Sequence, residues 1–345
     1  VSKEDWKAAQ AAFASYMRNR EGPDWHFNWR NPLAIENGQV TSRQILTAQD
    51  ALNNRFTIIE IPHTFTNGID WGYNPTTQPG SKYAANNEWT WQFNRHKWWV
   101  DMGRVYHFFA DERYAEAFVN QMMDWVKKNP VPETHQQGPG SRWRSIEAGI
   151  RMGEVWPDAF LLFLRSPSFT DEALITMVKS MVEHARYLSK PTRDGNWLTM
   201  EMNGLYHVGV LFPEFKEAEG WRNYAAERMR KELDVQVYPD GAQYELSSRY
   251  HNVALNSFLG IVNIARLNGY ELPEGYMERL ESMFEFNLYM MTPSGNLPRF
   301  NDSHNTNVAQ QMMKGYMLFP HRRDFRWAAL GRGAGTPPEH TSYAF

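Results

Sequence analysis

The 345-residue sequence contains no cysteine, which excludes disulfide bonds, cysteine nucleophiles and thiolate metal sites. It also has no excess of basic side chains, because 36 Lys and Arg against 39 Asp and Glu give a formal net charge of −3. A protein that neutralises a phosphate backbone normally presents a basic face, so this balance argues against nucleic acid as a partner. The sequence has no run of about 18 apolar residues that would span a membrane.

The first residues, Val-Ser-Lys-Glu-Asp, include neither an initiator Met nor the apolar centre of a signal peptide. We therefore expect a mature or trimmed N-terminus. A chain of this length can bury a sizeable core without a disulfide or a metal, and we expect no cofactor.

Aromatic residues are abundant: the chain has 14 Trp, 16 Tyr and 20 Phe, although its mean hydropathy is −0.62. Large rings often fill gaps between helices, and we expect this for most of the tryptophans. The alternative is that some rings are exposed and stack against sugar rings.

Helical periodicity dominates the sequence. Tyr114, Phe118, Met122 and Trp125 recur every three or four residues and form one apolar stripe, and Pro130 ends that helix. Similar patterns predict helices at residues 91–109, 111–129, 144–164, 171–188, 203–211, 215–235, 244–267, 277–291 and 305–317. Loops rich in Gly and Pro separate them, and no fixed repeat is present.

Helix pairs joined by such loops predict an all-α fold, in which helical hairpins form an incomplete (α/α) toroid or barrel. We assign residues 1–340 to this one domain, with loops gathered around a groove on one face. Residues 1–85 are less regular, and we expect them to wrap the outside or wall the groove.

The first loop-to-helix junction that could carry catalytic residues lies at residues 194–207. Asn196 follows a Gly turn and opens a helix, and Glu201 and His207 lie further along it. The structural alternative is that Asn196 is a helix N-cap, a position that Asn suits.

The second junction covers residues 240–251, where a Pro-Asp-Gly turn leads into a helix that carries the adjacent pair Tyr250 and His251. Side chains at adjacent helix positions point about 100° apart, so both cannot aim at one atom. The structural alternative is that Tyr250 packs at a helix–helix contact with its hydroxyl satisfied.

The third junction combines residues 94–99 with residues 141–151. Arg144, Glu147 and Arg151 are spaced three and four apart and share a helix face. They could form a salt-bridged surface or a polar stripe that faces a groove for an anionic sugar.

Four segments taken together carry a resemblance. They are residues 91–99, 141–151, 195–215 and 240–251, with the patterns Asn-Arg-His-Lys-Trp-Trp, Trp-Arg-Ser-Ile-Glu-Ala-Gly and Asp-Gly-x-Gln-x-Glu-Leu-Ser, and the Asn-Asp-Ser of residues 301–303 agrees with them. This combination resembles the heparinase II/III family of polysaccharide lyases, and within it the heparinase III (heparan sulfate lyase) type.

The resemblance implies a secreted or periplasmic bacterial enzyme with a helical toroid followed by a β-sandwich. It implies that Asn196 binds a uronate carboxylate, that Tyr250 moves protons, and that a His of the sandwich shares catalysis. From its position beside Tyr250, His251 is a further candidate catalytic residue, as a modulator or a carboxylate ligand. One departure is Trp197, where several relatives place His. The chain ends about where the sandwich should begin, and residues 341–345 would be its start.

These residue types suit β-elimination at a uronic acid. The reaction removes the C5 proton and expels the 4-linked oxygen, and hydrogen bonds to the carboxylate stabilise the charge that develops. Asn offers two neutral N–H donors. A free Tyr has a pKa of about 10, so it serves as a proton donor, or as a base if cations such as His251, Arg249 or the Arg144/Arg151 face lie near.

We expect these elements to converge on one groove that binds an acidic polysaccharide. The candidate substrate-binding residues are Asn94, Arg95, His96, Arg144, Glu147, Arg151, Trp197, Glu201, Gln243 and Glu245. The alternatives are an alginate or other polyuronate lyase, a non-catalytic sugar-binding domain, or an α/α-barrel glycoside hydrolase. The hydrolase would need a carboxylate pair, which Glu147, Glu201, Glu245 and Asp302 could supply.

Overall fold

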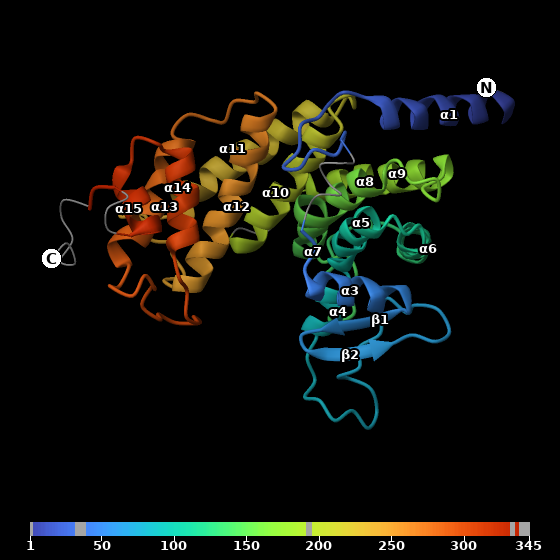
Figure 1. Cartoon of the computed structure of the whole chain (residues 1–345), viewed down its shortest axis with the longest axis horizontal. Coiled ribbons are helices and arrows are strands. Elements are labelled where there is room, and N and C mark those ends of the chain that lie inside the picture. The colour runs from blue at the N-terminus through green and yellow to red at the C-terminus, as the bar shows by residue number, and fades with distance from the viewer. Residues whose placement is uncertain (1–2, 32–38, 191–194, 332–334, 338–345) are drawn as a thin grey trace. The chain divides into compact units, whose positions relative to one another are not determined.

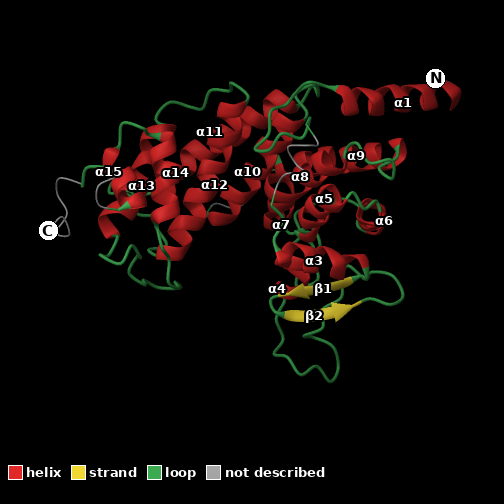
Figure 2. Cartoon of the chain, in the orientation of Figure 1, coloured by secondary structure: helices red, strands yellow, loops and turns green. Residues whose placement is uncertain are grey.

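The computed structural model describes residues 3–31, 39–190, 195–331 and 335–337. Its regular structure is almost entirely helical (Figures 1 and 2), so the predicted all-α class is confirmed. None of the helices in these ranges is long and apolar enough to cross a membrane. Residues 341–345, proposed above as the start of a sandwich, lie outside the described residues.

The chain divides into two compact units. The first comprises residues 1–192, 200–225 and 266–269, and the second comprises residues 193–199, 226–265 and 270–345. Elements wholly in the first unit are α1 (Lys3–Asn19), α3 (Ser42–Leu52), β1 (Arg55–Ile58), β2 (Ile61–Thr64), α4 (Glu88–Phe93), α5 (Trp98–Phe109), α6 (Arg113–Lys128), α7 (Ser145–Ile150), a π-helical turn (Arg151–Val155), α8 (Trp156–Phe163) and α9 (Asp171–Leu188).

Three helices carry the chain between the units: α10 (Asn196–Leu211), α11 (Ala218–Gln236) and α12 (Ser248–Leu267). The second unit continues with α13 (Tyr276–Met290), α14 (Ala309–Leu318) and α15 (Arg323–Leu330). Among the residues described, the strands are confined to the antiparallel hairpin β1–β2, in which Arg55 pairs with Thr64 and Ile58 with Ile61.

The apolar stripe predicted for residues 111–129 is confirmed in α6. Tyr114, Phe118, Met122 and Trp125 are all buried, and α6 packs against α5 and α9. Burial of such side chains contributes about 1.5–3 kcal/mol each, which explains why this helix forms where its periodicity places it.

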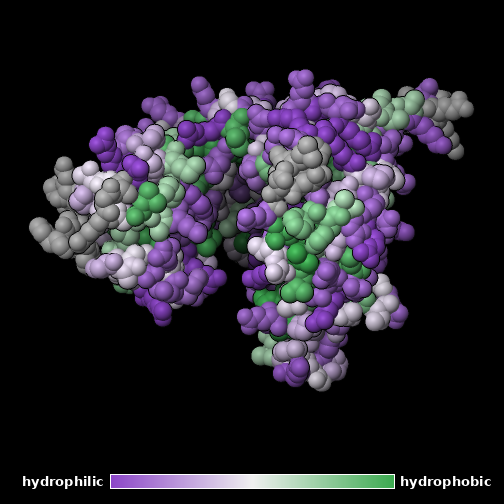
Figure 3. All heavy atoms as spheres, in the orientation of Figure 1, coloured by the Kyte–Doolittle hydropathy of each residue, from purple (hydrophilic) through white to green (hydrophobic). Residues whose placement is uncertain are grey.

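Most large rings fill the core, as expected. Trp89, Trp99, Trp125 and Trp156 are each 0% exposed, and the Trp99 ring stacks 4.3 Å from the ring of His96. In the view of Figure 3 the surface is largely hydrophilic, with hydrophobic atoms gathered over the part of the first unit that contains α5 and α7.

The helix predicted at residues 91–109 is in fact two helices. α4 ends at Phe93 and α5 begins at Trp98, because His96 adopts a left-handed backbone with φ of 60°, which a helix does not accept. Asn94 at this break donates to the Trp71 carbonyl and accepts from the Trp125 indole, both at 2.9 Å. These tertiary bonds override the local apolar period.

Other features also differ from the prediction, and the helix predicted at residues 203–211 begins already at Asn196. Residues 144–164 are helical as predicted, but Arg151–Val155 form a π-helical turn within them. The helix predicted from residue 244 begins at Ser248, because Leu246 has a left-handed φ of 53°. The segment 1–85 contains α1, α3 and the β1–β2 hairpin, which apolar periodicity did not indicate.

Helices α7 and α10 cross at two glycines within the first unit. A Cβ at Gly149 would lie 2.6 Å from the Met200 carbonyl oxygen and 2.7 Å from the Glu201 Cα, and a Cβ at Gly204 would meet the Gly149 backbone. Two backbones can approach this closely only where both residues lack a side chain.

We therefore expect Gly149→Ala to lower the free energy of unfolding by about 1–3 kcal/mol, because the added methyl group overpacks the crossing. The measurement is denaturant unfolding. The matched control is Gly220→Ala in α11, where a Cβ meets nothing within 4 Å, and which should raise stability by up to about 1 kcal/mol through helix propensity. Equal effects of the two substitutions would refute the tight crossing.

Candidate functional site

Asn196 is the first residue of α10, as the sequence indicated. Gly195 before it has a φ of 91°, which glycine adopts without strain. The side-chain Nδ2 of Asn196 donates to Glu245 Oε1. A carboxylate only accepts hydrogen bonds, so the amide must turn its NH₂ group toward Glu245. Its Oδ1 is buried and has no hydrogen-bond partner among the described residues.

A closed ring of hydrogen bonds holds Asn196 from both sides, all within the second unit. The Gly195 N–H donates to Glu232 Oε2 at 3.4 Å, and Gln236 Nε2 donates to the same oxygen at 2.5 Å. Gln243 Nε2 donates to Gln236 Oε1 at 3.4 Å, and the Glu245 N–H donates to Gln243 Oε1 at 3.0 Å. The bond from Asn196 to Glu245 closes this ring, which we call the Asn196 ring.

The ring members differ in exposure. Glu232, Gln236 and Gln243 are 3%, 0% and 1% exposed, whereas Glu245 is exposed and Asn196 is half-buried. Gln243 was a candidate substrate ligand. Its side-chain oxygen and nitrogen are both engaged inside the ring, so the structure assigns it to the support of the site rather than to the surface that meets a ligand.

Tyr250 lies in the first turn of α12, because this helix begins at Ser248 and not at residue 244 as predicted. Its N–H donates to Ser247 Oγ at 3.2 Å, a helix-capping bond. Ser303 of the Asn-Asp-Ser segment accepts the Arg249 N–H at 3.1 Å. The Tyr250 ring is half-buried, with the Arg249 guanidinium carbon 5.5 Å from its centroid. The 301–303 segment thus fixes the start of the helix that carries Tyr250.

His251 does not supply the positive charge that we expected. It is 1% exposed, its Nδ1 accepts the Gln243 N–H at 3.3 Å, and its Nε2 lies 3.1 Å from the Met283 carbonyl. Nε2 must therefore carry the proton and donate it. Burial lowers the pKa of His251 to about 4, because desolvation disfavours the charged form, so the ring is neutral at pH 7.

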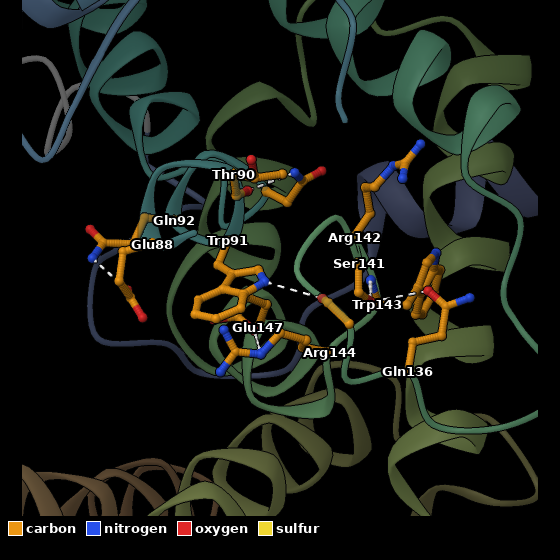
Figure 4. Close-up of polar contacts among 12 residues, drawn as sticks. Glu88, Thr90, Trp91, Gln92, Gln136, Ser141, Arg142, Trp143, Arg144 and Glu147 are labelled. Atoms are coloured by element: carbon orange, nitrogen blue, oxygen red, sulfur yellow. Dashed lines mark hydrogen bonds and ion pairs between the residues drawn. The ribbon is translucent and has the colours of Figure 1, made fainter. Parts of the chain in front are cut away.

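A second polar cluster lies in the first unit, where Arg95 and Arg144 both form ion pairs with Glu147. Figure 4 shows Arg144 and Glu147 beside Trp91. The distances from Glu147 are 2.9 Å to Arg95 and 3.4 Å to Arg144. The Arg144 guanidinium carbon lies 3.6 Å from the centroid of the Trp91 indole. Arg142 extends away from this pair in the figure. The cluster has two cations for one buried carboxylate, with Glu88 3.9 Å from Arg95.

Several other candidates from this region are enclosed in the core of the first unit. Arg151 is 0% exposed and donates to the carbonyls of Asn94 and Arg142 and to the ring of His184. His96 is 0% exposed and accepts the Trp156 indole N–H at 3.1 Å. The helix face is therefore neither a surface ion-pair face nor a stripe with three exposed residues. Glu147 and Arg151, both 0% exposed, stabilise the fold, and Arg144 keeps an exposed fraction of 6%.

Two further candidate ligands are buried among the described residues. Asn94 is 0% exposed, and its amide oxygen and nitrogen are both bonded to the chain. Glu201 is also 0% exposed and lies on α10 where that helix crosses Gly149. Trp197 is half-buried. Of the candidate ligands, Arg95, Trp197 and Glu245 are those with appreciable exposure.

The comparison with known proteins decides the family. The model of the heparinase II/III N-terminus matches residues 1–327. The chain belongs to this family. A heparin-sulfate lyase of Bacteroides stercoris is 34% identical over 299 residues, which are 80% of this chain and 43% of that protein. A heparin-sulfate lyase of Pedobacter heparinus is 32% identical over 346 residues, which are 98% of this chain and 51% of that protein.

The fold agrees with this membership. A crystal structure of heparinase III superposes with a TM-score of 0.83 at 26% identity, covering 98% of this chain and 54% of that one. The chain spans about half the length of the curated heparinase II/III relatives it matches.

For this heparinase II/III family member, the sequence analysis proposed Asn196 and Glu245 as site residues and did not propose Glu232 and Gln236, which are linked to them in the Asn196 ring. The segment that contains them, Lys-Glu-Leu-Asp-Val-Gln, has the composition of an exposed helix end, and only the i,i+4 spacing of Glu and Gln indicates a shared face. The role of Ser303 as a capping partner of α12 was indicated only by the Asn-Asp-Ser pattern. The Arg95–Arg144 cluster lies in the other unit from Asn196 and Tyr250, and their convergence on one groove stays a prediction.

The burial of His251 predicts how the free energy of unfolding depends on pH. Its pKa in the folded state is about 4 against about 6.5 when unfolded, so the unfolded state binds more protons as the pH falls through this window. His251 therefore contributes nothing to the pH dependence of unfolding above about pH 6.5, and lowers stability as the pH drops toward about 4.

Nitrogen-detected NMR of the His251 ring should show the Nε2–H tautomer unchanged from about pH 8 to pH 5.5. The control is the same ring in urea-unfolded protein, which should titrate near 6.5. An imidazolium signal from folded protein at about pH 6 would restore His251 as a cation beside Tyr250.

Proposed function

We propose that the protein containing this chain cleaves heparan sulfate, or a closely related uronate-containing polysaccharide, by β-elimination, and that this chain is its N-terminal helical part. The observation that carries the proposal is the Asn196 amide, which is held with its NH₂ group oriented by Glu245 in a unit that also carries Tyr250. The curated relatives named as heparin-sulfate lyases support the reaction class.

In this mechanism Asn196 donates a hydrogen bond to the uronate carboxylate. Removal of the C5 proton converts that group into an enediolate-like anion, and a donor already in place stabilises it more than it stabilises the ground state. The bond to the 4-linked oxygen then breaks, and that oxygen receives a proton. The products are an unsaturated uronate and a free sugar end.

Tyr250 is the proposed proton-transfer group. It lies at the N-terminal end of a 20-residue helix, where the backbone N–H groups leave partial positive charge, and the Arg249 guanidinium lies near its ring. Both place positive charge in the neighbourhood of Tyr250. His251 takes no part as a cation, so we propose that a His from a C-terminal β-sandwich shares proton transfer with Tyr250.

The remaining proposals concern the whole protein. The length of the relatives supports a C-terminal domain beyond this chain, and we propose that the helical hairpins form an incomplete (α/α) toroid that packs against it. A bacterial enzyme acting on an extracellular polysaccharide would be periplasmic or secreted. The hydrolase alternative is disfavoured because Glu147 is ion-paired and 0% exposed and Glu201 is 0% exposed, which leaves few candidate carboxylate pairs.

In the intact gene product, Tyr250→Phe should lower kcat by a factor of roughly 10² to 10⁴, because it removes a proton-transfer group and keeps the ring. Asn196→Ala should lower kcat by a factor of roughly 10² to 10³ through loss of a donor to the developing charge. The assay follows the ultraviolet absorbance of the unsaturated product from heparan sulfate.

Tyr289→Phe is the control, because this tyrosine of α13 is 43% exposed. Wild-type kcat and kcat/KM for Tyr250→Phe with normal expression would make Tyr250 a packing residue. Cleavage without ultraviolet absorbance would identify a hydrolase instead, and activity only on alginate would change the substrate.

Arg95→Ala should raise KM several-fold with little change in kcat, because Arg95 would attract the polyanion without touching the reacting bond. The effect should shrink between about 0.05 and 0.5 M salt as screening increases. Arg144→Ala should act in the same direction but less strongly, because Arg144 is less exposed. Lys127→Ala, an exposed cation of α6, is the control, and an equal effect from it would show general charge attraction.

A further inference from the structure

We propose that the Asn196 ring, through Glu245, is a device that positions the Asn196 amide, so that Glu245 acts as a positioning residue and not as a ligand of the substrate. The inference rests on the proposed function of Asn196 as donor to the uronate carboxylate. It assigns roles to Glu232, Gln236 and Gln243, which supply the buried side of the ring.

The direction of every bond in the ring follows from its two carboxylates. Glu232 can only accept, so it must receive the Gly195 N–H and the NH₂ group of Gln236. The oxygen of Gln236 is then available for the NH₂ group of Gln243, and the oxygen of Gln243 receives the Glu245 N–H. No amide in this series can turn over without breaking two bonds.

At the exposed end of the ring, Glu245 imposes the same choice on Asn196. One N–H of Asn196 is used by Glu245, and the second N–H of the same nitrogen is the donor that remains for a ligand. Without the carboxylate, the amide would be free to present its oxygen, which would repel a uronate. The ring also fixes the main chain of Gly195. It therefore constrains both the backbone from which the Asn196 side chain extends and the direction of its amide.

The position of Glu245 is itself fixed by a second loop. Asn301 Nδ2 donates to the carbonyl oxygens of Glu245 and Leu246 at 3.3 and 2.9 Å. Leu246 and Asn301 both have left-handed backbones, with φ of 53° and 52°. Such conformations cost energy for residues other than glycine and persist where surrounding contacts enforce them. The two hydrogen bonds from Asn301 therefore stabilise the turn that places Glu245 next to Asn196.

The charge of Glu245 argues against its direct contact with a uronate. Two carboxylates within hydrogen-bond reach of one amide repel each other, so a negative ring member weakens ground-state binding while it orients the donor. Removal of the Glu245 charge should therefore lower kcat and leave KM unchanged or reduced. A variant that merely disrupts the structure of the site would not be expected to lower KM. The alternative is that the Glu245 carboxylate occupies the position of the substrate carboxylate and must be displaced before substrate binds. In that case Glu245→Ala should raise kcat/KM.

The experiment compares Glu245→Ala, Glu245→Gln and Gln236→Leu with wild type, in the intact gene product acting on heparan sulfate. Glu278→Gln is the control, because Glu278 is an exposed carboxylate of α13 in the same unit. Glu245→Ala should lower kcat by about 10- to 100-fold, as expected for a misdirected group, with KM not raised. Glu245→Gln should lose less, because its oxygen can still accept from Asn196.

The double variant Gln236→Leu/Glu245→Ala should lose no more than the larger single loss, because both substitutions open one ring. Additive losses, or a kcat for Glu245→Ala equal to or above wild type, would overturn the proposal. Glu245 is exposed, so its variants test the idea even if Gln236→Leu fails to fold.

A readout independent of activity separates this inference from the proposed function. In Asn-labelled protein, one Asn196 side-chain N–H resonance should lie at low field because it donates to a carboxylate, and Glu245→Ala should abolish that displacement. If the resonance does not move, the ring does not hold Asn196. If it moves but wild-type protein makes no unsaturated product, the ring stands and the lyase proposal fails.

Discussion

A carboxylate can only accept hydrogen bonds, and the burial of Glu232 makes this constraint decisive for the second unit. At 3% exposure its oxygens must find donors in the chain, since an unsatisfied buried charge is very costly. The Gly195 N–H, the Gln236 amide and, at 3.9 Å, the Arg228 guanidinium surround it. The beginning of α10 is therefore tied to the end of α11 before any ligand is considered.

In the first unit the buried charge is a cation, which needs hydrogen-bond acceptors instead of donors. A guanidinium only donates, and Arg151 is fully buried, so its N–H groups need acceptors within the chain. It finds the carbonyls of Asn94 and Arg142 and the Nε2 atom of His184. That last bond forces the His184 proton onto Nδ1, where it is donated to the Ser180 carbonyl at 2.7 Å. One buried cation thus sets the tautomer of a histidine and holds the break between α4 and α5.

Single-sequence reasoning predicted those parts of the molecule that depend on local pattern. The stripe of α6 and the helix start at Asn196 follow from residues within a few positions of each other. The capping box of α3, in which Thr41 and Gln44 are bonded reciprocally, is also a local pattern, although the sequence analysis did not predict a helix there. Periodicity could not reveal that His96 would leave the helical region, because its partners, Trp156 above all, lie 60 residues away.

The candidate site shows the same division. Asn196 and Tyr250 were proposed through the family resemblance, whereas the exposure of each candidate ligand depends on tertiary packing. Arg144, Glu147 and Arg151 share a spacing that fits an exposed polar stripe, yet Arg151 is enclosed between Trp125 and Trp143, with its guanidinium carbon 4.7 and 5.2 Å from their centroids. Spacing tells which residues share a face of a helix, and not what covers that face.

The π-helical turn at Arg151–Val155 has a consequence for how sequences of this family vary. A π turn accommodates one residue more than an α-helical turn, and each residue of an α-helix rotates the chain by about 100°. The extra residue is absorbed as a bulge, so its loss would close the turn into regular α-helix without rotating α8 relative to α7. The turn is therefore a place where the chain can gain or lose one residue while the Trp156 indole keeps its hydrogen bond to His96.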